Sequence, residues 1–350
     1  MRTWFGARVK RSPTRDNRQM RLPDYAPRPA HLKWLLDSDP AIRWQVMRDL
    51  TGEAPEAIAA ERSRVATEGR GAHLLALQSP AGNWGGPKED RGLLITLYTL
   101  VVLKDLGLDP ASKQARKMID RVDKRLVFKP LNSRPFLHGE TEPCINGRIL
   151  AIGAYFNEPN DALANQLLGE QLEDDGWNCE ARPFLPPKRP QSQRSSFHTT
   201  ICVLEGLLEY ERAVHKSVAV NRARKRAENY LLDRRMFRSL RTGEVIDKRW
   251  LRFSYPTFWH YDILRGRDYD QPARRDGGGP VSGAAPLPDA AGLRPCDVVL
   301  SEDNPSLKVG ARIIASTGCP RGREGLRKGN NTRSQRTSVV PAGHICRARR

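Results

Sequence analysis

Four short polar motifs combine residue types that bind metal ions or transfer protons. Each precedes or begins an apolar stretch with helical spacing. They are His138-Gly-Glu-Thr-Glu142-Pro-Cys144, Trp177-Asn-Cys179-Glu180, Phe197-His198-Thr199 and Trp259-His260-Tyr261-Asp262. The N-terminus of a helix favours the thiolate of cysteine and the neutral form of histidine. Because these are the forms that bind metals, the four motifs are candidates for one common site.

The metal prediction is a zinc site built from Cys144, Cys179 and His198, with His260 as the fourth candidate ligand and Asp262 as its alternative. Three protein ligands and one open position are typical of a catalytic zinc. The competing interpretation is structural, with small buried cysteines and polar groups that cap helices. The sequence leaves both interpretations open.

Glu142 and Asp262 are the candidate catalytic carboxylates. As a general acid, Glu142 would need a raised pKa in a dry pocket. A carboxylate near a helix N-terminus is also favourable without any catalytic role.

Five aromatic residues are candidates for the lining of an apolar ligand cavity, where their π faces could stabilise cations. Aromatic residues at helical spacing also form ordinary core, which is the alternative. The five are Tyr98, Tyr155, Phe197, Tyr255 and Trp259.

The elements that must position these residues are helices throughout residues 31–270. Apolar residues recur at helical spacing with no alternating strand pattern. The expected helices span residues 31–36, 41–50, 54–68, 72–78, 93–106, 110–126, 145–156, 161–172, 196–215, 221–232 and 256–264. Helices of this length joined by short turns predict an all-α fold of stacked helical hairpins.

Two segments repeat one pattern. Leu74 to Trp84 and Leu167 to Trp177 both read as a helix that ends in Gln, a short turn with Gly, and then Trp. Such units cannot bury their own apolar faces and must stack on one another.

These Gln…Gly-Trp segments resemble the QW-type repeats of the terpenoid cyclase and protein prenyltransferase superfamily. Ser196-Phe-His198-Thr-Thr resembles the helix that carries a zinc-binding histidine in prenyltransferase β subunits. The resemblance covers about residues 31–270 and implies an α/α toroid, here incomplete at its C-terminus. It also implies an isoprenoid-type apolar ligand in a central cavity, with zinc at the cavity mouth.

The sequence departs from that family at two points. No Asp-x-Cys pair occurs, and Cys179 lies much closer to His198 than the family's Asp and Cys ligands lie to its histidine. The run Leu172-Glu-Asp-Asp175 lacks the first Asp of a cyclase D-x-D-D motif and reads as a charged turn. The alternative function is therefore a non-catalytic helical scaffold or binding protein with the same fold.

The net charge of +19 on 350 residues is concentrated at the two ends of the chain. Residues 1–30 form a basic segment, and residues 271–350 lack aromatic residues and are rich in Gly, Pro and Arg. Such a tail cannot bury enough surface to fold, so we expect it to be disordered or read out of frame. The folded part then carries about +5, an ordinary value that favours no nucleic-acid partner.

No apolar run approaches the roughly 20 residues of a membrane span, and the N-terminus has no apolar signal segment. Six scattered cysteines in a chain of this length are expected to be reduced. We therefore expect a cytoplasmic protein without a membrane span.

Overall fold

The structure, a computed structural model, describes residues 27–85, 89–181, 192–215, 217–252 and 254–275. Helices make up nearly all of its regular structure, which confirms the all-α prediction. They are α1 Pro29–Leu36, α2 Pro40–Val46, α3 Pro55–Ser63, α4 Gly69–Ala76, α5 Glu89–Asp105, α6 Lys113–Arg125, α7 Pro143–Tyr155, α8 Asp161–Gly169, α9 Phe197–Ala213, α10 Val218–Asp233 and α11 Ile263–Arg275. One antiparallel pair, β1 Val127–Phe128 and β2 Arg134–Pro135, is the only sheet among the described residues.

Local sequence signals start several helices. Asp39 caps α2, because its side chain accepts a hydrogen bond from the backbone of Ala41 at 2.9 Å, and Pro40 occupies the first helical position. Ser112, Asn160 and Ser217 cap α6, α8 and α10 in the same way. Side-chain caps satisfy backbone N–H groups that have no partner within the helix.

The two Gln…Trp segments make the same hydrogen bonds. The indole of Trp84 donates to the carbonyl of Leu74 at 2.8 Å, and that of Trp177 donates to the carbonyl of Leu167 at 2.7 Å. The backbone N–H of each tryptophan donates to a threonine hydroxyl in a following helix, Thr96 or Thr200, at 3.0 Å in both cases. Each segment therefore ties the end of one helix to the helix that follows.

The side chain of the glutamine in each segment reaches a further helix. Gln78 donates to the carbonyl of Met118 in α6 at 3.1 Å, and Gln171 donates to that of Ala223 in α10 at 2.9 Å. The equivalent bonds place α4 beside α6 and α8 beside α10.

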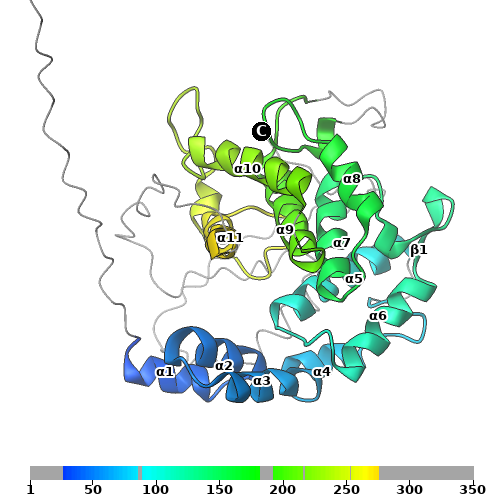
Figure 1. The fold of residues 1–350 in the computed structure, drawn as a ribbon, viewed down its shortest axis with the longest axis vertical. Helices are drawn as coiled ribbons and strands as arrows, with labels where there is room; N and C mark the ends of the chain where they lie inside the picture. Colours follow the sequence, from blue (N-terminus) through cyan, green and yellow to red (C-terminus); the bar gives the residue numbers. More distant parts are fainter. Residues whose placement is uncertain (1–26, 86–88, 182–191, 216, 253, 276–350) are drawn as a thin grey trace, which may run out of the picture.

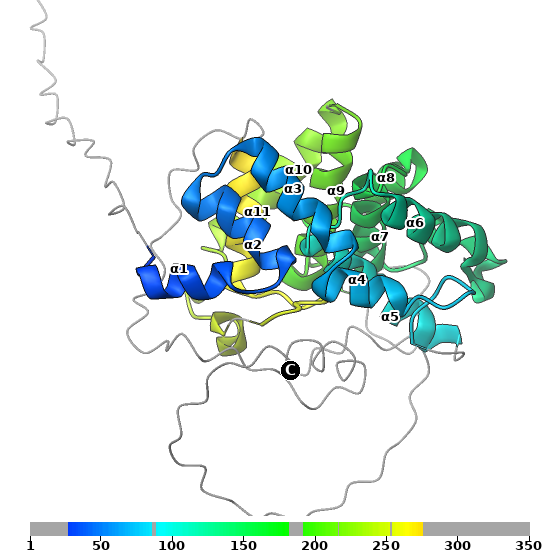
Figure 2. The ribbon, with the colours of Figure 1, turned by 90° about the horizontal axis from the view of Figure 1, so that it is seen from below.

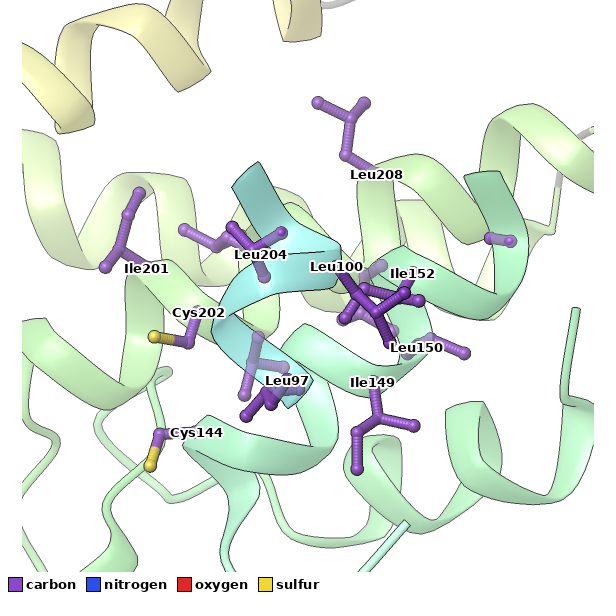
Figure 3. Close-up of a cluster of buried hydrophobic side chains, with 14 of the residues drawn as sticks. Leu97, Leu100, Cys144, Ile149, Leu150, Ile152, Ile201, Cys202, Leu204 and Leu208 are labelled. Carbon is purple, nitrogen blue, oxygen red and sulfur yellow. The ribbon is translucent and has the colours of Figure 1, made fainter. Parts of the chain in front are cut away.

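The helices lie in two layers that follow a curve (Figure 1). Helices α6, α8 and α10 succeed one another along its outer side, and α5, α7 and α9 lie inside it. Leucine and isoleucine side chains of α5, α7 and α9 form one buried cluster, which includes Leu97, Leu100, Ile149 and Leu204 (Figure 3). This cluster forms the core that supports the first turns of α7 and α9.

The predicted helix over residues 256–264 is wrong. Phe258 has a φ of 48°, which a right-handed helix does not allow, and the last helix, α11, begins only at Ile263. This helix continues to Arg275, past the expected boundary at residue 270. The predictions for residues 1–26 and 276–350 lie outside the described residues.

Candidate metal site at the start of α7

Three predicted site residues converge at the N-terminal end of α7. One ligand atom from each of Glu142, Cys144 and Cys179 lies within 4.8 Å of the other two. Both cysteines are buried, and Sγ of Cys144 lies 3.7 Å from Oε2 of Glu142. A carboxylate and two thiols are a donor set that suits zinc. The structure thus brings Cys144 and Cys179 together and places Glu142 beside them.

The first turn of α7 positions two of these side chains. Glu142 is the N-cap residue, Pro143 occupies the first helical position, and Cys144 follows it. Pro fits this position because its fixed φ is helical and it has no N–H to satisfy. The helix N-terminus carries partial positive charge, which favours the thiolate that a metal needs.

The loop before α7 is held by Asn146. Its Oδ1 accepts the backbone N–H of Glu140 at 2.7 Å, and its Nδ2 donates to the carbonyl of Glu140 at 3.1 Å. Gly139 packs against the Asn146 amide and has a φ of 79°. A Cβ on Gly139 would lie 2.6 Å from Oδ1 of Asn146. Glu140 in turn accepts the N–H of Glu142 at 2.6 Å. These contacts fix the backbone that presents Glu142.

Cys179 is positioned by the first turn of α9. The backbone N–H of Ser196 donates to the carbonyl of Trp177 at 2.8 Å, and Trp177 is bonded back to Thr200. The thiol of Cys179 lies 3.5 Å from the hydroxyl of Thr199. Thr199 belongs to the polar motif Phe197-His198-Thr199, and this contact makes it a group that orients the Cys179 thiol.

His198 does not join the two cysteines, although it lies in the same turn as Thr199. Its Nδ1 accepts the backbone N–H of Tyr261 at 2.7 Å. Burial lowers the pKa of His198 to about 4, and the nearby His260 and Arg265 act in the same direction. The ring is therefore neutral at pH 7, with its proton on Nε2, so neither nitrogen offers a free lone pair to a metal.

His260 also lies outside the group of described residues that could hold a metal. Its ring stacks on that of Trp259, with the centroids 3.9 Å apart, and lies 5.9 Å from the ring of His198. Burial lowers its pKa, and Arg265 lowers it further. The two histidines are thus neutral members of an aromatic cluster in this structure.

Asp262, the second candidate catalytic carboxylate, caps α11. Its Oδ1 accepts the backbone N–H of Arg265 at 2.9 Å, and its Oδ2 accepts the hydroxyl of Ser254 at 3.1 Å. Asp262 is buried, and these bonds use both of its oxygens. The contacts of Asp262 therefore give it a structural role at the start of α11.

The five predicted cavity aromatics lie in different surroundings. Phe197 is buried against Tyr230, Trp250 and Tyr261, with centroid distances of 4.8 to 5.5 Å. Trp259 packs on the two histidines, Tyr98 lies 4.5 Å from Phe258, and Tyr255 is 43% exposed. Tyr155 lines a groove at the other end of α7.

A buried ion network joins α7, α9 and α11. Glu205 accepts from Arg148 at 2.6 Å and from Nε and Nη2 of Arg265, both at 2.8 Å. Burial acts to raise the pKa of Glu205, but the two arginines outweigh it and lower the pKa to about 2. No motif in the sequence indicates this network, because its members lie 57 and 60 residues apart in the chain.

No helix of the described residues is both long and apolar enough to cross a membrane. No protein-family model matches the chain, and comparisons with curated proteins and with solved structures found no match.

Proposed function

We propose that this chain is a zinc-binding protein of the prenyltransferase-like kind, with the metal held by Glu142, Cys144 and Cys179. The observation that carries the proposal is the convergence of their ligand atoms within 4.8 Å. Zinc accepts two thiolates and one carboxylate and leaves a fourth position for a substrate atom. When bound there, zinc would supply Lewis acidity and stabilise the thiolate of an acceptor substrate.

The donor set agrees with one part of the family resemblance. The sequence lacks an Asp-x-Cys pair, but Glu142-Pro-Cys144 is a carboxylate-x-Cys pair, and both of its side chains belong to the group. Thr199 orients the second thiol, as hydrogen-bonding partners of metal ligands commonly do. The proposed fold is an α/α toroid, of which the curved double layer of helices would be the part described (Figure 1).

The proposed ligand is an isoprenoid-type apolar molecule near the zinc. A non-catalytic scaffold is the second candidate, and one observation favours it. The buried Arg148–Glu205–Arg265 network and the close contact of α7 with α9 leave the region between these helices filled.

Zinc content of the purified full-length protein tests the metal site. We expect about one zinc per chain after loading and desalting, and loss of that zinc in Cys144→Ser and in Cys179→Ser. Cys202→Ser is the matched control, because Cys202 is also buried but lies against Arg265, outside the group. A further variant changes Cys296, Cys319 and Cys346, which lie outside the described residues, and it should keep its zinc.

A wild-type protein that keeps no zinc would overturn the proposal, as would equal zinc loss in Cys202→Ser. Farnesol binding to the zinc-loaded protein tests the ligand. Binding that Cys144→Ser weakens supports an isoprenoid site near the metal, whereas zinc without farnesol binding favours the scaffold.

A further inference from the structure

A groove of about 530 Å³ lies at the opposite end of α7 from the metal-site residues. Tyr155, at the end of α7, is eleven residues from Cys144, which corresponds to about 17 Å along the helix axis. Helices α2 and α3, which lie side by side in both views, form much of its wall (Figure 2). Its volume is that of an ordinary small-molecule site.

The apolar part of the groove consists of Trp44, Pro55, Ile58 and Ala59. The indole of Trp44 lies against Gly107, where a Cβ would collide with the ring and where φ is 83°. Trp44 Nε1 donates to the carbonyl of Leu106 at 3.0 Å. The indole is therefore held in one orientation, with its polar atom already satisfied.

Three consecutive carbonyls after α5 hold three side chains of the groove. Leu106 accepts from Trp44, Gly107 accepts from Arg62 Nε at 2.9 Å, and Leu108 accepts from the Tyr155 hydroxyl at 2.9 Å. The same hydroxyl accepts from Nη2 of Arg62 at 3.1 Å. These bonds fix the guanidinium before any ligand arrives, which reduces the entropy that binding would cost.

Arg62 forms no ion pair with a carboxylate of the described residues, although Asp105 lines the same groove. Its hydrogen-bond acceptors, the carbonyl of Gly107 and the hydroxyl of Tyr155, are both neutral. The other two cations of the groove are paired, Arg48 with Asp49 at 2.6 Å and Lys104 with Asp105 at 2.8 Å. Glu209 and Glu205 add to the negative potential at Lys104. Arg62 is therefore the cation of the groove that is held only by neutral acceptors and by the Trp44 ring, over which its guanidinium lies at 5.4 Å.

We propose that this groove binds a small monocarboxylate with an apolar chain, whose carboxylate pairs with Arg62. A single carboxylate matches the one cation of the groove that forms no ion pair among the described residues, and a guanidinium forms strong hydrogen bonds with a carboxylate. The chain of the ligand lies against Trp44, Ile58 and Ala59. This site is independent of the zinc proposal, because it shares no residue with the metal group.

Calorimetric titration of the full-length protein with decanoate tests the proposal. Decanol, which has the same chain length without the charge, should bind at least tenfold more weakly. Arg62→Gln should weaken decanoate binding at least tenfold. Arg64→Gln is the matched control on the same segment, because Arg64 pairs with Glu61 and Glu68 away from the groove. The affinity of the Arg64→Gln variant for decanoate should differ from that of wild type by less than twofold.

Arg62→Gln also removes bonds that hold the groove, so a second variant separates folding from binding. Ala59→Trp fills the groove from an exposed position and leaves Arg62 unchanged. It should abolish decanoate binding while its thermal unfolding midpoint stays near that of wild type. Absence of decanoate binding to wild type, equal binding of decanol, or unchanged binding in Ala59→Trp would overturn the proposal.

Discussion

Gly147 of α7 and Gly206 of α9 face each other where these helices touch, and a Cβ on Gly206 would collide with the carbonyl oxygen of Gly147. A Cβ on Gly147 would likewise collide with the backbone of Cys202. Both obstacles are backbone atoms, which cannot move aside as the end of a flexible side chain can. This contact sets the spacing of the two helices whose first turns hold Cys144 and Thr199.

We therefore expect Gly206→Ala to destabilise the fold by about 2 to 3 kcal/mol, in the upper part of the range for overpacked cores. Gly169→Ala in α8 is the matched control, because a Cβ there meets no atom within 4 Å. Alanine is the better helix former, but Gly169 is the last residue of α8, so this control should change the stability by less than about 0.5 kcal/mol. Urea unfolding of both variants measures the difference, and equal effects would contradict the role given to the α7–α9 contact.

Thr200→Val tests the bond that joins the second Gln…Trp segment to α9. The substitution keeps the shape of the side chain but leaves the buried N–H of Trp177 without its partner. An unsatisfied buried donor costs about 1 to 3 kcal/mol, and we expect a loss of stability in that range by urea unfolding.

Thr99→Val is the control for that variant. The hydroxyl of Thr99 donates to the carbonyl of Ile95 one turn earlier in α5, so its loss leaves no buried N–H unpaired. We expect Thr99→Val to lower the free energy of unfolding by less than about 0.5 kcal/mol. If Thr99→Val lost as much stability as Thr200→Val, the hydrogen bond between Thr200 and Trp177 would not explain the effect of Thr200→Val.

His198 should make stability depend on pH. Its pKa is about 4 in the fold, because of burial first and then of neighbouring charge, against about 6.5 for an exposed histidine. The unfolded chain therefore binds the proton first as pH falls. The stability from neutral His198 is complete above pH 6.5 and is lost as pH falls from 6.5 to about 4, by about 3 kcal/mol.

His198→Asn isolates this contribution. The Asn amide oxygen can accept the Tyr261 N–H in place of Nδ1, but the side chain does not titrate. We expect the free energy of unfolding of the variant to vary less than that of wild type between pH 4 and pH 6.5. His260 remains in both proteins, so the difference between the two curves reports His198 together with its electrostatic interaction with His260. Parallel curves would show that His198 is not held neutral by the fold.

The helices could be predicted from sequence because their signals are local. Asp39-Pro40 marks the start of α2, and the apolar spacing of Ala115, Met118, Ile119 and Val122 marks the buried face of α6. Residues 256–264 carry helical spacing as well, but Phe258 has a left-handed backbone and Asp262 caps a helix that begins later. Apolar spacing alone does not specify where a helix starts.

The sequence by itself determined that Cys144 stands just before or at the start of one helix and His198 in the first turn of another, because caps and apolar periodicity are properties of neighbouring residues. Only the tertiary structure decided which of these side chains meet. Cys179 and Glu142 join Cys144, whereas the backbone N–H of Tyr261, 63 residues away, takes the Nδ1 of His198. Hydrogen bonds between distant segments decide which side chains remain able to bind a metal. The spacing of residues along the chain does not specify these hydrogen bonds.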